Sequence, residues 1–580
     1  MADQAHARRA ERLQRFCSTV QGTAPHARSK SVGRIRSHAL DGQPNQPYYH
    51  QLRASSLMFS NPWALLAHDP GLGKTTTALL TEAGIACRDG DALKTLVTAP
   101  LSTLEQWYET AQNWLKPEFA AKVHIVRTQS DVTAERLDRP QLIICTHELL
   151  VQARASCFYW EYEDRFDERF QRFVGGWRRR PKVPLHPIFV AAFDLFVIDE
   201  VHRMRNPKSQ LTLAHALVAK NARHRLGLTG TPVFNHPIDM VGQAMALNAG
   251  THFQDVENWS SDPQRRTINR ATSERWNRNV HRATDADLTP PLPPLVEEYV
   301  SFAPGSIDHE RYNEYLETAD EARQRQQDGH ARSDDHFQML VALQKMQQAL
   351  ISPDLADRGA RAFAESPGSL EAAVKLDLPC LKVLRQQVQE LQTSGIHRVV
   401  VACDRVLPLK IAQAMLRPSG VGDVFLFDGS LSPAARRTMR RKFMGARKAV
   451  MLLSIQAGGT GTHLAPGVNG MILWGARPFS AQQVRQAVKR VHRIGQTAAV
   501  QVRHIVADGS VDAAIVEMHK SKIALAEAVV DGMWDNLADG EADKKNEYRW
   551  HTYTRLMNYV APAQSDGTFA LAARSSAAAS

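Results

Sequence analysis

The sequence contains few cysteines, and none of them form the closely spaced pairs that hold zinc. Its six cysteines stand at positions 17, 87, 145, 157, 380 and 403, without any Cys-x-x-Cys motif. This spacing argues against a structural zinc module and against a disulfide framework, and it favours a reducing compartment.

Long apolar runs are also missing. No uninterrupted apolar stretch could span a bilayer, and the polar start of the chain does not resemble a secretory signal. We therefore expect a soluble, intracellular protein with no membrane partner. The sequence does not distinguish a nucleus, a bacterial cytoplasm, or a viral factory or virion.

Acidic residues are fewer than basic residues in this chain. The 580-residue chain has 60 of them against 71 lysines and arginines, which gives a formal net charge of +11. The excess favours a polyanionic partner such as nucleic acid, although the same balance fits a merely basic soluble protein. The length predicts three or four domain-sized units.

A glycine-rich GLGKT segment predicts a loop that binds nucleotide phosphates, because an apolar run precedes it and a helix-like stretch follows. The strict pattern requires glycine where this chain has His68, so a glycine-rich turn before an ordinary helix is the alternative. Gly71 and Gly73 still permit a tight turn that aims N–H groups at phosphate oxygens. Lys74 would then contact the β- and γ-phosphates, and the Thr75 hydroxyl would hold Mg²⁺.

A short apolar run further along the chain ends in two adjacent acids, Asp199 and Glu200. Such a run is typical of a buried parallel strand whose carboxyl end presents acids to a ligand. Asp199 would bind Mg²⁺, and Glu200 would orient and polarise the attacking water. An isolated acid pair fits a strand capped by solvated acids equally well. Its place after a phosphate loop instead predicts a nucleotide hydrolase that uses ATP and Mg²⁺.

Strand-like and helix-like segments alternate over two long stretches, 47–250 and 366–530, and each predicts a parallel sheet with helices on both faces. Residues 251–365 lack this alternation and predict a helical linker or insertion. Residues 531–580 predict a C-terminal helical extension with a disordered tail. The polar, basic residues 1–46 predict a disordered arm, which either binds nucleic acid or is a solvated tail without function.

Further motifs follow in a fixed order. They are YHQ at 49–51, GLGKT at 71–75, TAPL at 98–101, THE at 146–148, DEVH at 199–202, LTGTP at 228–232, DGS at 428–430, AGGTG at 457–461 and QAVKRVHRIGQ at 486–496. This ordered set resembles the Swi/Snf-type ATPases of helicase superfamily two, double-stranded-DNA translocases that remodel or evict proteins on DNA. The resemblance covers about 47–525, and the HRIGQ ending is characteristic of this family rather than of helicases at large. It implies an α/β fold with two RecA-like parallel-sheet lobes in tandem.

The resemblance also implies roles for individual residues. Gln486 should contact the γ-phosphate or the attacking water, and Arg490 and Arg493, one helical turn apart, should act as arginine fingers. Outside this motif the two arginines would indicate a solvated basic helix face. The expected nucleotide-binding residues are Gln51, which reads the adenine edge, with Gly71, Leu72, Gly73, Lys74, Thr75, Thr76 and Gly461. Thr98, Thr146 and Thr460 are candidates for nucleic-acid phosphate contacts, with ordinary strand-end threonines as the alternative.

The stretch 151–192 is longer than the family pattern requires and carries aromatic and arginine-rich segments. It is either a DNA-contacting insertion or a small satellite core with a solvated basic edge.

Three functions remain open. The first is an ATP-driven translocase on double-stranded DNA that remodels or displaces DNA-bound protein. The second is a strand-separating helicase or a viral transcription-termination ATPase that releases a polymerase. The third is a non-hydrolysing scaffold that binds nucleic acid, and the presence of Lys74, Asp199, Glu200 and Arg493 argues against it. Double-stranded DNA is the expected partner, with DNA-bound proteins or a polymerase as further partners.

Overall fold

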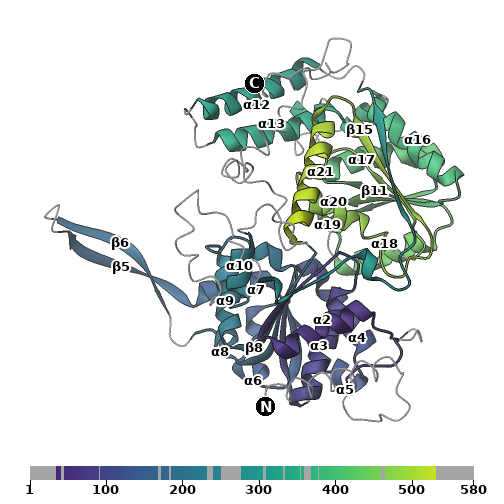
Figure 1. Ribbon diagram of the computed structural model, residues 1–580. Coiled ribbons are helices and arrows are strands. Elements are labelled where there is room, and N and C mark those ends of the chain that lie inside the picture. Colours follow the sequence, from purple (N-terminus) through teal and green to yellow (C-terminus); the bar gives the residue numbers. More distant parts are fainter. Residues whose placement is uncertain are drawn as a thin grey trace. The chain divides into compact units, whose positions relative to one another are not determined.

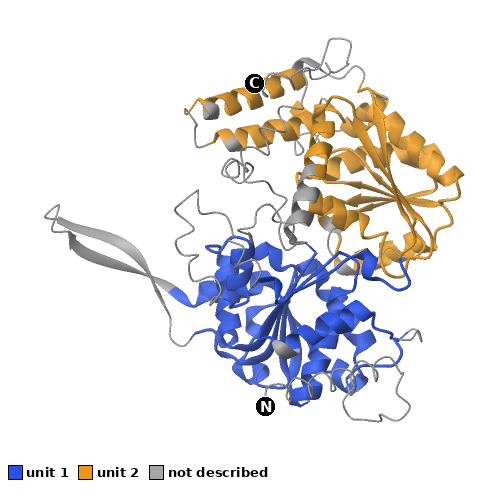
Figure 2. Cartoon of the chain, viewed as in Figure 1, with its two compact units in different colours: residues 1–291 blue, residues 292–580 orange. Residues whose placement is uncertain are grey.

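The chain forms two compact units, residues 1–291 and 292–580 (Figure 2). The computed structural model describes residues 34–40, 45–90, 92–167, 172–181, 185–230, 239–249, 276–304, 309–328, 330, 334–352, 354–357, 368–376, 378–458, 464 and 466–530. The expected basic arm therefore lies largely outside the described residues, and so does the expected tail from 531 onward. No helix in the described ranges is long and apolar enough to cross a membrane.

Unit 1 is built on a seven-stranded sheet in the order β3-β4-β2-β7-β8-β1-β9, in which every pairing is parallel. Its strands are β1 (Trp63–His68), β2 (Lys94–Ala99), β3 (Val123–Val126), β4 (Gln141–Thr146), β7 (Phe193–Ile198), β8 (Ala222–Thr229) and β9 (Val280–Ala283). Its helices include α2 (Tyr49–Ser60), α3 (Lys74–Asp89), α4 (Leu104–Trp114), α5 (Pro117–Ala120), α6 (Ala134–Leu137), α7 (His147–Ser156), α8 (Pro187–Val190), α9 (Gln210–Lys220) and α10 (Asp239–Ala246).

Helices cover both faces of this sheet. Figure 1 shows α2, α3 and α4 on one side and α7, α9 and α10 on the other. The central strands are buried on both faces, which explains their nearly continuous apolar sequences, such as WALLAH in β1. Parallel strands place their carboxyl ends at one edge of the sheet, so the segments that follow β1 and β7 come together there.

Unit 2 contains a six-stranded, all-parallel sheet in the order β10-β15-β14-β11-β13-β12. Its strands are β10 (Leu295–Phe302), β11 (Arg398–Cys403), β12 (Asp423–Phe427), β13 (Ala449–Ser454), β14 (Gly470–Leu473) and β15 (Val500–Ala507). Its helices include α12 (His309–Gln327), α13 (Asp335–Ala349), α15 (Ser369–Lys375), α16 (Pro379–Thr393), α17 (Val406–Leu416), α18 (Pro433–Gly445), α19 (Ile455–Gly458), α20 (Ala481–Val488) and α21 (Val511–Val530).

The two faces of β11 pack into two separate apolar clusters. Val399 and Val401 join the cluster that contains residues of α16 and α17. Val400 and Ala402 join the cluster that contains Phe443 of α18 and residues of α20. Both units therefore have the predicted RecA-like arrangement, a parallel sheet between two layers of helices, and the predicted α/β fold class is confirmed.

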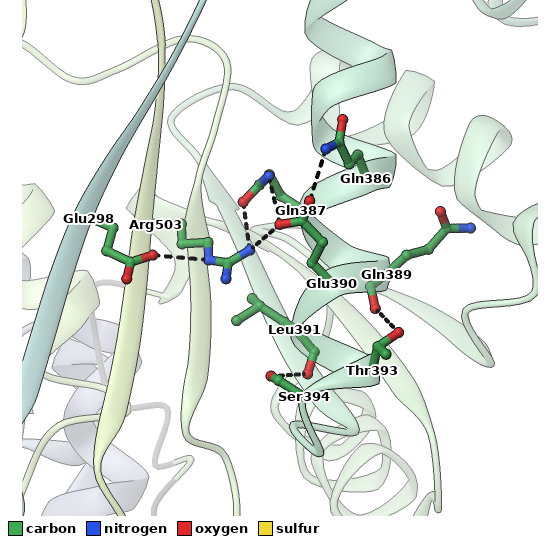
Figure 3. Close-up of polar contacts among 9 residues, drawn as sticks. All are labelled: Glu298, Gln386, Gln387, Gln389, Glu390, Leu391, Thr393, Ser394 and Arg503. Atoms are coloured by element: carbon green, nitrogen blue, oxygen red, sulfur yellow. Dashed lines mark hydrogen bonds and ion pairs between the residues drawn. The ribbon is translucent and has the colours of Figure 1, made fainter.

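An arginine ties the edge strand β10 to the rest of unit 2. Arg503 on β15 lies with its Nε 3.4 Å from Glu298 Oε2 of β10, and its Nη1 donates to Gln387 Oε1 at 2.6 Å and to Glu390 Oε2 at 2.9 Å (Figure 3). Gln387 and Glu390 belong to α16. One side chain thus joins two strands and the helix that covers them.

The segment 251–365 differs from the expected helical linker. Helices α12 and α13 lie in it, but it also supplies β9 to the sheet of unit 1 and β10 to the sheet of unit 2. Both strands are short or exposed, so neither shows the apolar run that marks a central strand. Within 151–192, strands β5 (Phe158–Asp167) and β6 (Arg172–Pro181) pair antiparallel to each other.

Candidate nucleotide-hydrolysis site

The predicted phosphate loop connects β1 to α3. Gly71 and Gly73 have φ angles of 95° and 76°, in the left-handed region that favours glycine. A Cβ on Gly73 would also lie 2.4 Å from Gln51 Nε2, so a side chain at this position would have to displace the end of Gln51. Lys74 opens α3, and its Nζ donates to the carbonyl oxygen of His68 at 3.0 Å. The loop thus leads into a helix N-terminus, the arrangement that binds phosphates.

Helix α2 holds the loop from one side. Buried Gln51 accepts a hydrogen bond from Tyr48 N at 3.0 Å and donates one to the carbonyl oxygen of Leu72 at 3.3 Å. His50 Nε2 donates to the same carbonyl at 3.0 Å. The amide to which the resemblance gives adenine recognition therefore contacts the loop directly. Thr75 and Thr76 follow Lys74 in the first turn of α3.

Asp199 follows β7 and is only 7% exposed. Its Oδ2 accepts from Trp107 Nε1 at 2.9 Å, and its Oδ1 accepts from the Glu200 amide at 3.0 Å. Burial, and then the charge of Glu200, raise the pKa of Asp199 to about 7, while the Trp107 hydrogen bond and the Lys74 charge act in the opposite direction. Unit 1 therefore brings the loop lysine and the two acids together.

Glu200 has a φ of 51°, which is uncommon for a residue other than glycine. Its Oε2 lies 3.3 Å from His202 Nδ1, which is also 3.0 Å from Thr229 Oγ1 at the end of β8. The ends of β7 and β8 are thereby linked beside the acid. Neither Trp107 nor His202 has a role that the sequence motifs predict. The sequence signal for His202 is its place in the DEVH motif.

Gln486 lies in α20 of unit 2, whereas Arg490 and Arg493 follow that helix, in a turn rather than one helical turn apart. Gln486 and Arg490 are half-buried, whereas Arg493 is only 8% exposed. Burial, followed by the charges of Arg490 and Arg440, lowers the pKa of Arg493 to about 9. Its Nε has no hydrogen-bond partner among the described residues. A buried cation beside two like charges is stabilised by an anion, so the group is suited to a phosphate.

The HRIGQ ending has a structural role as well. His492 Nε2 donates to the carbonyl oxygen of Pro293 at 2.9 Å. Gln496 Nε2 donates to the carbonyl oxygens of Val468 at 2.8 Å and Val491 at 2.9 Å. These bonds fix the turn that carries Arg493.

The threonines proposed to contact nucleic acid are placed differently from the residues proposed for hydrolysis. Thr98 is completely buried in β2, and its Oγ1 donates to the carbonyl oxygen of Val197 at 3.4 Å. Thr98 lies in a central strand that is buried on both faces, so its hydroxyl is enclosed in the sheet, and a nucleic-acid contact by this residue stays a prediction. Thr146 is half-buried and caps α7 by accepting from the Leu149 amide at 3.1 Å. Thr460 and Gly461 lie outside the described residues.

Comparison with known proteins identifies the family. The family model of the SNF2-related domain matches residues 48–352, and the model of the helicase conserved C-terminal domain matches residues 381–495. The first of these matches covers more than half of the chain.

Two relatives illustrate the range of similar proteins. The chain is 24% identical to the chromodomain-helicase-DNA-binding protein 3 homolog of Caenorhabditis elegans, over 86% of this chain but only 27% of that protein. It is 27% identical to a probable global transactivator of Orgyia pseudotsugata multicapsid polyhedrosis virus, over 77% of this chain and 82% of that one. A solved structure, the Sulfolobus solfataricus SWI2/SNF2 ATPase core in complex with dsDNA, shares 21% identity with a TM-score of 0.35, over 86% of this chain and 96% of that chain. The chain belongs to the SNF2 family of helicase-like ATPases in helicase superfamily two.

Proposed function

We propose that this chain couples ATP hydrolysis to movement along double-stranded DNA and thereby remodels or displaces DNA-bound protein. The observation that carries the proposal is the grouping of Lys74, Asp199 and Glu200 at one edge of the unit 1 sheet. This is the set that a nucleotide hydrolase requires, and unit 2 adds Arg490 and Arg493. Membership in the SNF2 family supports the same reaction.

The residues present fit ATP and Mg²⁺. The buried Asp199 carboxylate and the Thr75 hydroxyl are hard oxygen ligands of the kind that Mg²⁺ prefers, and the charge of Glu200 beside Asp199 favours a cation there. Bound Mg²⁺ would neutralise charge on the triphosphate. Lys74 would pair with the β- and γ-phosphates, and Glu200 would orient the attacking water. Gln51 would contact the adenine, and Gln486 the γ-phosphate or the water.

The two arginines give the reaction its dependence on both units. In the proposed reaction, Arg490 and Arg493 stabilise charge on the γ-phosphate from the second lobe. Hydrolysis then requires closure of one lobe on the other, and DNA bound to both lobes can promote that closure. The net positive charge suits a partner held mainly through phosphates.

ATPase rates without nucleic acid and with duplex DNA, single-stranded DNA or RNA test this proposal. We expect stimulation by duplex DNA of any sequence, with affinity that falls steeply as salt rises, because phosphate contacts carry no sequence information. Lys74→Ala serves as the hydrolysis-deficient control.

A second assay separates translocation from strand separation. A translocase that follows one strand within a duplex should displace a triplex-forming oligonucleotide while leaving a blunt duplex paired. Stimulation by single strands alone, or efficient unwinding of a plain duplex, would instead favour the strand-separating helicase. Release of a stalled polymerase would favour the transcription-termination reading.

A further inference from the structure

The loop residue that departs from the strict phosphate-loop pattern has a partner far away in the sequence. His68 is fully buried, and its Nε2 lies 3.0 Å from Nδ1 of His281, so that one ring donates to the other. His281 belongs to β9, which pairs in parallel with β1 and places Leu66 opposite His281 and Ala67 opposite Arg282. The strand that leads into the phosphate loop is therefore held from Leu65 to His68 by β9.

The next pair of residues reinforces this connection. Arg282 Nη1 donates to the carbonyl oxygen of Ala67 at 3.0 Å and to Asp69 Oδ1 at 2.8 Å. The Asp69 amide donates to the carbonyl oxygen of Ala283 at 2.9 Å. The Asp69 side chain is 3% exposed and that of Arg282 is 23% exposed, so water screens this ion pair weakly.

We infer that four positioning residues hold the N-terminal part of the phosphate loop on β9. They are His68, Asp69, His281 and Arg282, here called the loop anchor. The inference rests on the proposed function, because it concerns the site where ATP would bind. The anchor acts through Lys74, whose Nζ donates to the carbonyl oxygen of His68. It therefore fixes the carbonyl that orients the lysine, as well as the backbone that leads into Gly71.

The histidine pair supplies an uncharged hydrogen bond. Burial, and then the neighbouring His281, lower the pKa of His68 well below its usual value, and burial lowers the pKa of His281 to about 4. The positive charges of Lys74 and Arg282 also disfavour a proton on His68. The ion pair between Asp69 and Arg282 is thus the charged link of the anchor, and the two rings are its neutral link.

The anchor also makes the loop sensitive to the segment that leaves unit 1. Strand β9 ends at Ala283, and unit 1 ends at residue 291, so the anchored strand leads directly into the connection to unit 2. The other side of the loop is held at Leu72 by α2. A displacement of this connection would therefore change the geometry of the loop at His68 and Asp69 while α2 still holds Leu72.

Nucleotide affinity of the full-length chain tests the inference. Binding of a fluorescent ADP analogue with Mg²⁺ and without DNA, together with kcat, KM and the melting temperature, would be measured for Arg282→Met, His281→Leu and the conservative Arg282→Lys. The matched control is Arg223→Met, which removes a surface ion pair with Asp89 elsewhere in unit 1. His281→Leu keeps the volume of the ring approximately and supplies a second variant should Arg282→Met fold poorly.

For Arg282→Met and His281→Leu we expect Kd and KM to rise about tenfold, with a much smaller change in kcat at saturating ATP, because bound nucleotide itself positions Lys74 and neither change touches Asp199 or Glu200. Arg282→Lys should recover most of the affinity, and Arg223→Met should match the parent. Unchanged Kd and KM with a lowered melting temperature would show a purely structural role and overturn the inference. A parent that binds nucleotide but fails in the DNA assays would refute the proposed translocation alone, whereas a parent that binds no nucleotide would refute both.

Discussion

Asp199 illustrates how single residues prepare this site for a charged ligand. The carboxylate is almost completely buried beside Glu200, and each of these conditions favours its protonated form. The indole of Trp107 and the Glu200 amide donate to its two oxygens and favour the charged form. These opposing effects on the charge of Asp199 mean that a cation bound beside it would favour the charged form.

Replacing Trp107 with phenylalanine tests this balance. A smaller aromatic ring is retained while the hydrogen bond to Asp199 is lost, so the pKa of Asp199 should rise further and Mg²⁺ should bind more weakly. We expect the Mg²⁺ concentration for half-maximal ATP hydrolysis to rise about tenfold, the lower range for loss of a partner that orients a metal ligand. Trp114→Phe on the same helix, which packs against the core without contacting Asp199, is the control. Equal Mg²⁺ dependence in both variants would contradict this role of Trp107.

Glu200→Gln separates nucleotide binding from hydrolysis. Asp199 and Lys74 remain in place, so affinity for ATP should stay close to that of the parent. Turnover should fall by about 10²–10⁴-fold, because the amide cannot accept a proton from the attacking water. Single-turnover hydrolysis measures this, with Glu135→Gln on the surface as the control. Turnover within about threefold of the parent would show that Glu200 has another role.

The residues proposed for hydrolysis stand out in the sequence because each motif keeps its chemistry within a few adjacent positions. Lys74 and the acid pair of Asp199 and Glu200 are recognisable in that way. The partners of these residues were not predictable. His68 contacts His281 across 213 positions, and only the pairing of β1 with β9 brings them together. The burial of Thr98 was not predictable either, since a motif position alone does not reveal that its strand is buried on both faces.

At the scale of elements, a close approach of backbones supports the acid motif. Helix α10 packs on the short 3₁₀ helix Val201–Met204, which follows Glu200 and contains His202. The contact is possible because residue 242 is glycine. A Cβ at this position would lie 2.0 Å from the carbonyl oxygen of Met204.

Gly242→Ala should therefore force α10 and the 3₁₀ helix apart. Alanine adds about 1 kcal/mol of helix propensity, but overpacking typically costs about 1–3 kcal/mol and here involves backbone that cannot turn aside. We expect a lower melting temperature and slower ATP hydrolysis, because His202 and Glu200 move with the displaced segment. The control is Gly445→Ala, where a Cβ would meet nothing within 4 Å. Its unfolding free energy should stay within about 0.5 kcal/mol of the parent. A fully stable, fully active Gly242→Ala variant would show that this contact is readily relieved.

The elements found by sequence are those buried on both faces. Strands such as β1, β7, β11 and β13 consist of short apolar runs, which are typical of strands buried in a parallel sheet. The α/β fold was predicted from these runs. Strand β9 has four residues, and β10 is an exposed edge strand, so both lacked this signal. The ladder of β5 and β6 arises from cross-strand pairing within a polar insertion, which periodicity alone does not indicate.

At the scale of the whole molecule, the chain consists of two units that each have a complete sheet and core. The residues proposed to bind ATP and activate water belong to unit 1, and the proposed arginine fingers belong to unit 2. In the proposed mechanism, such a division would allow nucleotide binding in one unit without hydrolysis. The turn that carries the arginines is held within unit 2 by the hydrogen bonds of His492 and Gln496.

Arg493→Ala tests whether the two units act as one enzyme. Nucleotide affinity should remain near that of the parent, because the loop and α2 are untouched. DNA-stimulated turnover should fall on the order of 10³-fold, the loss typical of an arginine finger. Exposed Arg417→Ala, which removes the same charge from the same unit, should retain stimulation. Loss of turnover together with intact ATP and DNA binding would place Arg493 in the reaction, since a variant that merely weakened DNA binding would recover at saturating DNA. Undiminished stimulation would show that unit 1 hydrolyses ATP without the arginines of unit 2, and a mechanism based on closure of the two lobes would have to be abandoned.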